Sequence, residues 1–129
     1  MKVIVTGGAG FIGSHLVDAL VEKDIEVIVF DNLSSGKLSN LNPKATLYPL
    51  DINSPEVLNI MKAVKPDAVF HLAAQADVGK SIENPIEDAQ ININGTINLL
   101  QGCVEASVGK FIFYKNTQAC ACVIFIIRK

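Results

Sequence analysis

The sequence predicts an α/β fold in which helices cover both faces of a doubly wound, parallel sheet of about five strands. Three observations predict it. Short β-branched runs alternate with segments of helical periodicity, a glycine-rich turn joins the first strand to the first helix, and two later helices open on an N-cap residue followed by proline. Because half of the 129 residues are hydrophobic, one domain of this size can bury a core.

The first part of the chain supplies two strands and one helix. Lys2–Thr6 is a β-branched run that ends in glycines, and Ile12–Val21 follows with apolar residues at helical spacing. Glu26–Phe30 has the character of a second buried strand. After it, Asp31 and Asn32 open a Ser/Gly/Asn-rich loop that has no apolar period. The second strand therefore ends at an acidic tip.

The rest of the chain continues the alternation of strands and helices. Thr46–Leu50 is a weak third strand, and Pro49 places it at a sheet edge because proline cannot donate to a ladder. The remaining elements are a helix opened by Ser54-Pro55 that runs to about Val64, a strand over Ala68–His71, a long helix opened by Asn84-Pro85 that runs to about Glu105, and a strand over Lys110–Tyr114. With right-handed crossovers the strand order is 3-2-1-4-5, which puts a crevice at the carboxyl ends of strands one and four.

Composition and charge exclude several classes of function. The net charge is −2 and the single arginine is Arg128, so the chain lacks the basic stripe that nucleic-acid binding demands. No apolar run approaches the roughly 18 residues of a membrane span, and too few residues precede Gly7 for a signal peptide. We therefore expect a cytoplasmic protein with no membrane partner. Cys103, Cys120 and Cys122 lack a second ligand pair for zinc, so we expect reduced thiols and no metal.

The turn after the first strand carries Thr6-Gly-Gly-Ala-Gly-Phe-Ile-Gly13, which satisfies the pattern G-x-G-x-x-G. Between a strand and a helix, missing Cβ atoms let the backbone approach a pyrophosphate, and free N–H groups at the helix start face its charge. The alternative is a turn that needs glycine only for close packing of the helix on the strand. The candidate phosphate-binding residues are Gly7, Gly8, Gly10, Phe11, Ile12 and Gly13.

Asp31 supplies the second feature of a dinucleotide site. A carboxylate at the end of the second strand accepts hydrogen bonds from an adenosine ribose and repels a 2′-phosphate. With Asn32 beside it and no arginine nearby, Asp31 favours NAD over NADP, although Lys37 in the same loop could act in the opposite direction. The alternative interpretation of Asp31 is a solvated turn aspartate.

Together with these residues, three further stretches resemble the extended short-chain dehydrogenase/reductase family, in particular its NAD-dependent epimerases and dehydratases of the UDP-glucose 4-epimerase type. The stretches are Asp51-Ile52, His71-Leu-Ala-Ala74 and Asn92-Ile-Asn-Gly-Thr96, and the resemblance covers about residues 2–113. It implies a Rossmann-type domain that binds NAD.

The resemblance also implies roles for individual residues. Asp51 and Ile52 would flank the adenine, Leu72, Ala73 and Ala74 would lie along the cofactor, Asn92 would point toward the cofactor side of the site, and residues 76–81 would run beside the nicotinamide and the substrate. The alternatives are a helix-capping Asp51, ordinary core packing of the Leu-Ala-Ala segment, and a polar Asn92 that needs some other partner. We interpret His71 as a hydrogen-bonded packing residue with no chemical role.

The catalytic base of that family is missing from this sequence. The family's reaction moves a hydride from a sugar carbon to NAD and returns it to the other face of a 4-keto sugar, and it uses a tyrosine with a lysine four residues later. Tyr48 and Tyr114 have no lysine at that spacing, and the family's serine is absent unless Thr117 takes its place. We therefore predict no catalytic residue here and no efficient turnover.

These observations divide the chain into an NAD-binding Rossmann-type domain, residues 1–114, and a divergent apolar tail, residues 115–129. The expected function is the NAD-binding portion of a nucleotide-sugar epimerase, truncated or frame-shifted before the substrate domain, so that a nucleotide sugar binds only to the full-length relative. The alternatives are a stand-alone NAD-binding or sensing module, a fragment of an NDP-sugar dehydratase or reductase, and a non-functional, association-prone product. The tail either adds a sixth strand at the sheet edge or has no selected role, and assembly into a homo-oligomer is left open.

Overall fold

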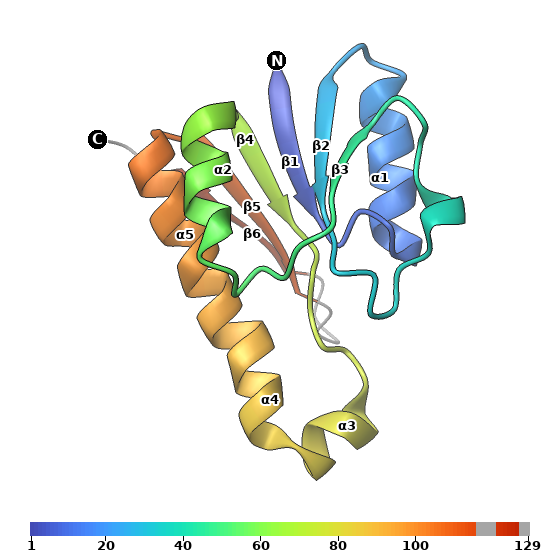
Figure 1. The fold of residues 1–129 in the computed structure, drawn as a ribbon, viewed down its shortest axis with the longest axis vertical. Coiled ribbons are helices and arrows are strands. Elements are labelled where there is room, and N and C mark those ends of the chain that lie inside the picture. The colour runs from blue at the N-terminus through green and yellow to red at the C-terminus, as the bar shows by residue number, and fades with distance from the viewer. Residues whose placement is uncertain (116–120, 127–129) are drawn as a thin grey trace.

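The computed structural model describes residues 1–115 and 121–126, and its centre is one twisted sheet (Figure 1). The sheet has the order β3-β2-β1-β4-β5-β6, and the first five strands are parallel, which confirms the predicted order 3-2-1-4-5. The strands are β1 (Lys2–Thr6), β2 (Glu26–Phe30), β3 (Thr46–Tyr48), β4 (Ala68–His71), β5 (Lys110–Lys115) and β6 (Ala121–Ile126).

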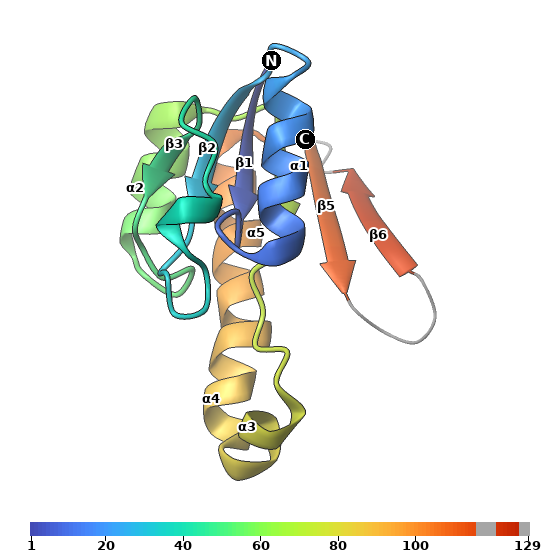
Figure 2. The ribbon, with the colours of Figure 1, turned by 90° about the vertical axis from the view of Figure 1, so that its right-hand side faces the viewer.

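The two edges of the sheet differ in how far the sequence predicted them. At one edge lies β3, which ends at Tyr48, just before the proline that indicated an edge position. At the other edge, β6 pairs antiparallel with β5 (Figure 2). Of the two interpretations of the tail, the sixth strand therefore agrees with the structure, whereas Thr117, Cys120 and Arg128 lie outside the described residues.

Most helices begin where the caps predicted, with one correction. Instead of one regular helix from Asn84-Pro85 to about Glu105, the structure has two α-helices joined by a π-helical turn. This wider turn coincides with a bond from the Thr96 hydroxyl to the Asn92 carbonyl, 2.8 Å. The helical elements are α1 (Phe11–Val21), η1 (Leu38–Asn40), α2 (Glu56–Val64), α3 (Val78–Glu83), α4 (Pro85–Ala89), the π-helix η2 (Gln90–Asn94) and α5 (Gly95–Ala106).

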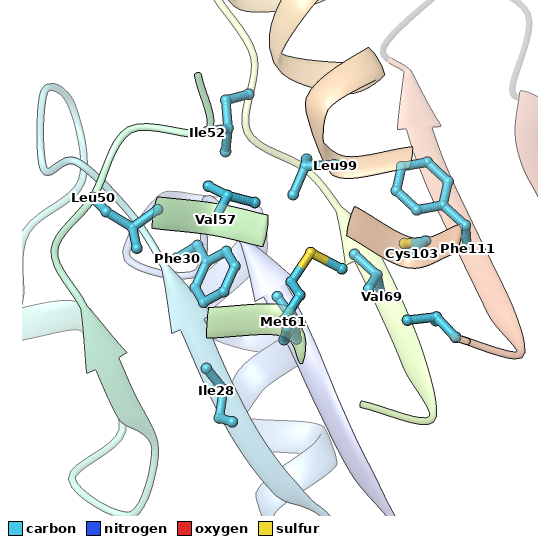
Figure 3. Packing of buried hydrophobic residues seen from close by; sticks show 12 residues of the cluster. Ile28, Phe30, Leu50, Ile52, Val57, Met61, Val69, Leu99, Cys103 and Phe111 are labelled. Carbon is cyan, nitrogen blue, oxygen red and sulfur yellow. The ribbon is translucent and has the colours of Figure 1, made fainter. Parts of the chain in front are cut away.

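Alternation along the strands divides the core into two layers. On β1 and β2, Val3, Val5, Val27 and Val29 pack with Val17 and Leu20 of α1 on one face of the sheet. The intervening side chains point to the opposite face, where α2 and α5 cover them. Figure 3 shows this second layer, which includes Ile28, Phe30, Val57, Met61, Val69, Leu99, Cys103 and Phe111.

The helical arm formed by α3 and α4 projects beyond the sheet, on the side to which the parallel strands point (Figures 1 and 2). Helix α3 was not predicted from the sequence. Its start is fixed by Asp77, whose carboxylate accepts the Lys80 N–H at 3.2 Å, and this N-cap signal was present in the sequence. Asn84 caps α4 in the predicted way, by accepting the Glu87 N–H at 3.2 Å.

No helix within residues 1–115 or 121–126 combines the length and the apolar character that a membrane crossing requires.

Candidate dinucleotide-binding site

A cavity of about 870 Å³ opens at the carboxyl ends of the central parallel strands, where the direction of strand succession reverses. Its volume lies within the range of roughly 300–1,000 Å³ that is usual for ligand pockets. Of the residues predicted from the sequence, the structure brings these to the cavity lining: Gly7, Gly10, Asp31, Asn32, Asp51, Ile52, Leu72, Ala73 and Ala74.

The glycine turn closes the space between β1 and α1. Gly7 has a φ of +71°, and a Cβ there would lie 2.9 Å from the Ala73 nitrogen. A Cβ on Gly13 would overlap the Gly7 carbonyl, while one on Gly8 would lie 2.7 Å from a methyl carbon of Val29. The turn thus needs glycine both for close packing of α1 and for its path past the loop that follows β4. Gly8 and Gly13 serve the packing and do not line the cavity.

The start of α1 has no side-chain cap, so the first N–H groups of this 11-residue helix are open to an anion at the rim of the turn. Neither Phe11 nor Ile12 is among the cavity-lining residues, and Phe11 is 81 % exposed with its ring edge-on to His15. If these two residues contribute to a site, they do so through their backbone.

Asp31 is buried and joins the second strand to the glycine turn. Its Oδ2 accepts the Ala9 N–H at 2.9 Å, and its Oδ1 accepts the Leu33 N–H at 2.8 Å. Each carboxylate oxygen keeps capacity for a further donor. Asp31 is therefore more than a solvated turn residue, because its position is fixed by the loop that would hold a phosphate.

Asn32 and Asp51 meet across the ends of β2 and β3. The Asn32 Nδ2 donates to Asp51 Oδ2 at 3.1 Å, and Asp51 Oδ1 accepts the Asn53 N–H at 2.8 Å. Ile52 is buried in the core, and its carbonyl accepts a bond from the Asn98 amide at 2.7 Å. Asn98 of α5 thereby holds this loop, a role that sequence reasoning missed.

Residues Leu72–Gln75, called here the wall, line the cavity, and their first members lie beside the glycine turn. The N–H groups of Leu72 and Ala73 donate to the Thr6 hydroxyl at 3.2 and 3.1 Å. At the other end of the wall, Asn92 accepts the Gln75 N–H at 2.9 Å and donates to the Gln75 carbonyl at 3.1 Å. Asn92 Nδ2 also donates to the Asp88 carboxylate at 3.1 Å, so the amide has partners in the wall and in α4. Asn92 is not among the cavity-lining residues.

His71 is buried at the end of β4, and both of its ring nitrogens have partners. Nδ1 lies 2.7 Å from the Thr6 hydroxyl and Nε2 lies 2.9 Å from the Thr96 hydroxyl. The ring stacks on Phe113 at a centroid distance of 5.1 Å. Burial lowers the pKa of His71 to about 4, so the imidazole is neutral near pH 7. These contacts confirm the interpretation of His71 as a hydrogen-bonded packing residue.

The half of the cavity that faces the helical arm was largely absent from the sequence-based prediction. Lys80 lies in the stretch expected beside the nicotinamide and the substrate, and Gln75 ends the wall. The other four side chains come from α4 and from the π-turn that was not foreseen. Within the described part of the chain, no group of three or more potential ligands is placed to hold a metal ion. The lining residues in this half are Gln75, Lys80, Glu87, Gln90, Ile91 and Asn94.

The fold and this crevice define a Rossmann-type α/β domain, and comparison with known proteins identifies its family. The model of the NAD dependent epimerase/dehydratase family matches residues 3–119. The chain belongs to this family.

Individual relatives narrow the resemblance further. The chain is 43 % identical over 111 residues to a putative UDP-glucose 4-epimerase of Methanocaldococcus jannaschii, covering 86 % of this chain and 36 % of that protein. It is similar to a UDP-glucose 4-epimerase of Thermotoga maritima solved with UDP-glucose, with 50 % identity, a TM-score of 0.87, and coverage of 88 % of this chain and 37 % of that one.

A UDP-glucose 4-epimerase of Thermus thermophilus, solved in complex with NAD, is 42 % identical with a TM-score of 0.82, over 86 % of this chain and 36 % of that one. The chain therefore spans little more than a third of the length of these relatives.

Proposed function

We propose that the cavity binds NAD, with the adenosine ribose at Asp31 and the pyrophosphate at the glycine turn. Asp51 and Ile52 would then flank the adenine, and the wall would run along the cofactor beyond the pyrophosphate. The observation that carries this proposal is the bond between Asp31 and the Ala9 N–H, because it unites the ribose acceptor and the phosphate turn in one rigid unit at one cavity.

The residues present fit such a group. The absence of Cβ atoms at Gly7 and Gly13 leaves the backbone of the turn closely packed, and the uncapped start of α1 faces the same rim. Asp31 keeps acceptor capacity for ribose hydroxyls and places negative charge where NADP would carry its 2′-phosphate. When bound, NAD supplies a two-electron hydride acceptor, and the chain's own residues hold and orient it.

For the whole protein, we propose the chemistry of an NDP-sugar 4-epimerase, in which a hydride leaves a sugar carbon and returns to the other face of a 4-keto sugar. Residues 1–114 would be its NAD-binding domain and residues 115–129 a divergent tail. The position four residues after Tyr48 is Ile52, and four after Tyr114 is Gln118, so no tyrosine–lysine base is present in these 129 residues. We therefore propose that this chain holds the cofactor without efficient turnover of a nucleotide sugar.

A second candidate is a module that binds NAD and performs no sugar chemistry. It is favoured by the combination of a well-formed cofactor cavity with the absence of the tyrosine–lysine pair. Dehydratase or reductase ancestry is also compatible with the family, whose members include proteins that act on other nucleotide sugars.

Calorimetric titration of the purified chain with NAD and with NADP tests the proposal. Saturable binding of NAD that is tighter than that of NADP supports it, and absence of NAD binding by a folded chain contradicts it. A second assay follows the conversion of UDP-glucose to UDP-galactose in the presence of NAD. Turnover there would contradict the proposed lack of activity, while binding without turnover supports it.

A further inference from the structure

A chain of hydrogen bonds crosses the interior between the end of β1 and the π-turn. It starts at the Thr6 hydroxyl, passes through the His71 ring to the Thr96 hydroxyl, and ends at the Asn92 carbonyl, with donor–acceptor distances of 2.7, 2.9 and 2.8 Å. Thr6 and His71 are buried and Thr96 is half-buried. Thr6, His71 and Thr96 are not among the cavity-lining residues.

The Asn92 carbonyl, at the end of this series of hydrogen bonds, determines which atom donates in each of them. The Asn92 carbonyl can only accept, so it takes the single hydroxyl proton of Thr96. The Thr96 oxygen must then accept from His71, which places the imidazole proton on Nε2. With its proton on Nε2, His71 accepts at Nδ1, so the Thr6 hydroxyl donates to it.

Because the Thr6 hydroxyl donates its proton to His71, its oxygen has two lone pairs available to accept, and both are occupied. They accept the N–H groups of Leu72 and Ala73, which begin the wall. A protonated His71 would present a second N–H to an oxygen that has no lone pair left. The neutral Nε2–H form of His71 is thus the form compatible with the hold of Thr6 on the wall, and the lowered pKa of this buried ring agrees with it.

Asn92 connects the two ends of the wall. Its backbone carbonyl ends the hydrogen-bond chain, and its side-chain amide holds the Gln75 backbone through two bonds, 2.9 and 3.1 Å. The first residues of the wall also lie against the glycine turn, since a Cβ on Gly7 would be 2.9 Å from the Ala73 nitrogen. One continuous set of bonds therefore holds the wall from Leu72 to Gln75.

We propose that Thr6, His71 and Thr96, with Asn92, form a positioning network that fixes the wall, and that this network sets the affinity for the part of the dinucleotide beyond the pyrophosphate. The three buried or half-buried side chains act through the wall and touch no ligand themselves. The effect on the dinucleotide rests on the function proposed above, whereas the network and its proton order are properties of the free chain.

The proton order is tested first on the unaltered chain, without NAD. Two-bond ¹H–¹⁵N correlation spectra of the imidazole report which nitrogen carries the proton. The expected result is a neutral Nε2–H ring for His71 at pH 6 to 7. A Nδ1–H tautomer, or a ring that is protonated at pH 6, overturns the inference.

The hold on the wall is tested by hydrogen exchange at the Ala73 amide, again without NAD. Leu72 N–H also has the Thr6 carbonyl at 3.2 Å, so Ala73 is the more sensitive reporter. Thr6→Val is expected to speed Ala73 exchange by about tenfold, because the half-buried Ala73 N–H loses its acceptor. Thr6→Ser is expected to restore slow exchange. Thr46→Val, the same change at an exposed position on β3, is the control. Equal Ala73 exchange in Thr6→Val and Thr46→Val overturns the inference.

The link to ligand affinity is tested by titrating Thr96→Val and Thr96→Ser with NAD and with ADP. Thr96→Val is expected to weaken NAD by about tenfold while ADP changes by less than about twofold, and Thr96→Ser is expected to bind NAD like the unaltered chain. Unchanged NAD affinity in Thr96→Val, or equal losses for NAD and ADP, overturns the link. If the unaltered chain binds no NAD, the proposed function and this link both fail, and the two NAD-free measurements still decide whether the network positions the wall.

Discussion

At the scale of single residues, Asp31 is the side chain on which the proposed cofactor preference depends most. Asp31→Ala is expected to weaken NAD binding at least about tenfold, because it removes a charged acceptor of two backbone N–H groups to which we also assign the ribose. The substitution should also reduce the difference in affinity between NAD and NADP, since it removes the charge that would repel a 2′-phosphate. Calorimetric titration measures both effects.

Asp67→Ala is the matched control for this substitution. The Asp67 carboxylate also accepts a backbone N–H, that of Lys2 at 2.7 Å, but it lies at the opposite end of the sheet. The control is expected to bind NAD like the unaltered chain. Equal affinities in Asp31→Ala and Asp67→Ala would contradict the assignment of the ribose to Asp31.

The buried His71 is expected to make the free energy of unfolding depend on pH. Burial lowers its pKa from 6.5 to about 4, so between these values the unfolded chain binds more protons than the folded chain. Stability from this group is therefore fully present above about pH 6.5 and is lost as the pH falls toward 4, with a total on the order of 3 kcal/mol. Urea unfolding at several pH values measures it. His71→Gln should show a shallower fall than the unaltered chain, and His15→Gln, on an exposed ring, should not.

At the scale of elements, the entry into α1 depends on a contact that only glycine permits. Gly13→Ala is expected to destabilise the fold by about 1–3 kcal/mol, because the new Cβ would overlap the Gly7 carbonyl and a backbone atom cannot move away by changing rotamer. Gly10→Ala is the comparison, since its Cβ would meet the same carbonyl at 3.2 Å. Urea unfolding should give Gly13→Ala a clearly smaller free energy of unfolding than Gly10→Ala. A larger value for Gly13→Ala would contradict the close contact of α1 with the glycine turn.

Helix α5 carries a thiol that its packing makes unreactive. Cys103 lies in the core between α5 and the sheet, and burial raises its pKa from 9.0 to about 12. We expect a Cys120→Ser, Cys122→Ser variant to react with Ellman's reagent at pH 8 many-fold more slowly when folded than in urea, because the thiolate is the reacting form. Rapid stoichiometric reaction of the folded variant would contradict this placement.

The sequence predicted the strands, their order and most helix starts, because these depend on local signals: β-branched runs, N-caps, prolines and glycines. It did not predict the π-turn at Gln90–Asn94, because that turn is accompanied by non-local hydrogen bonds. Thr96 bonds to His71 at the carboxyl end of β4, and Asn92 bonds to Gln75 just beyond it. The same reason explains why the contributions of Asn98 and Thr6 were missed. Their partners lie more than forty residues away in the chain, at separations of 46 for Asn98 and Ile52 and 67 for Thr6 and Ala73.

At the scale of the whole molecule, the parallel topology explains why residues from four separate stretches form one cavity. The strands β1, β2, β3 and β4 end at the same edge of the sheet, so the four stretches that follow them converge there. The arm of α3 and α4 adds a further side. The described residues thus form a crevice within little more than a third of the length of the relatives. We expect the proposed cofactor binding to be independent of sugar chemistry.

We expect the sheet edge next to β5 to affect whether this chain associates with its own copies. In the structure, β6 pairs along the length of β5 and so satisfies an edge that would otherwise present unpaired N–H and C=O groups. Deleting residues 116–129 removes β6 and is expected to increase self-association, whereas deleting residues 127–129 keeps β6 and is not. Light scattering after size-exclusion chromatography, over a range of concentrations, compares the two chains. If the shorter chain is monomeric while the longer one associates, the apolar tail is itself the associating segment and β6 does not protect the edge.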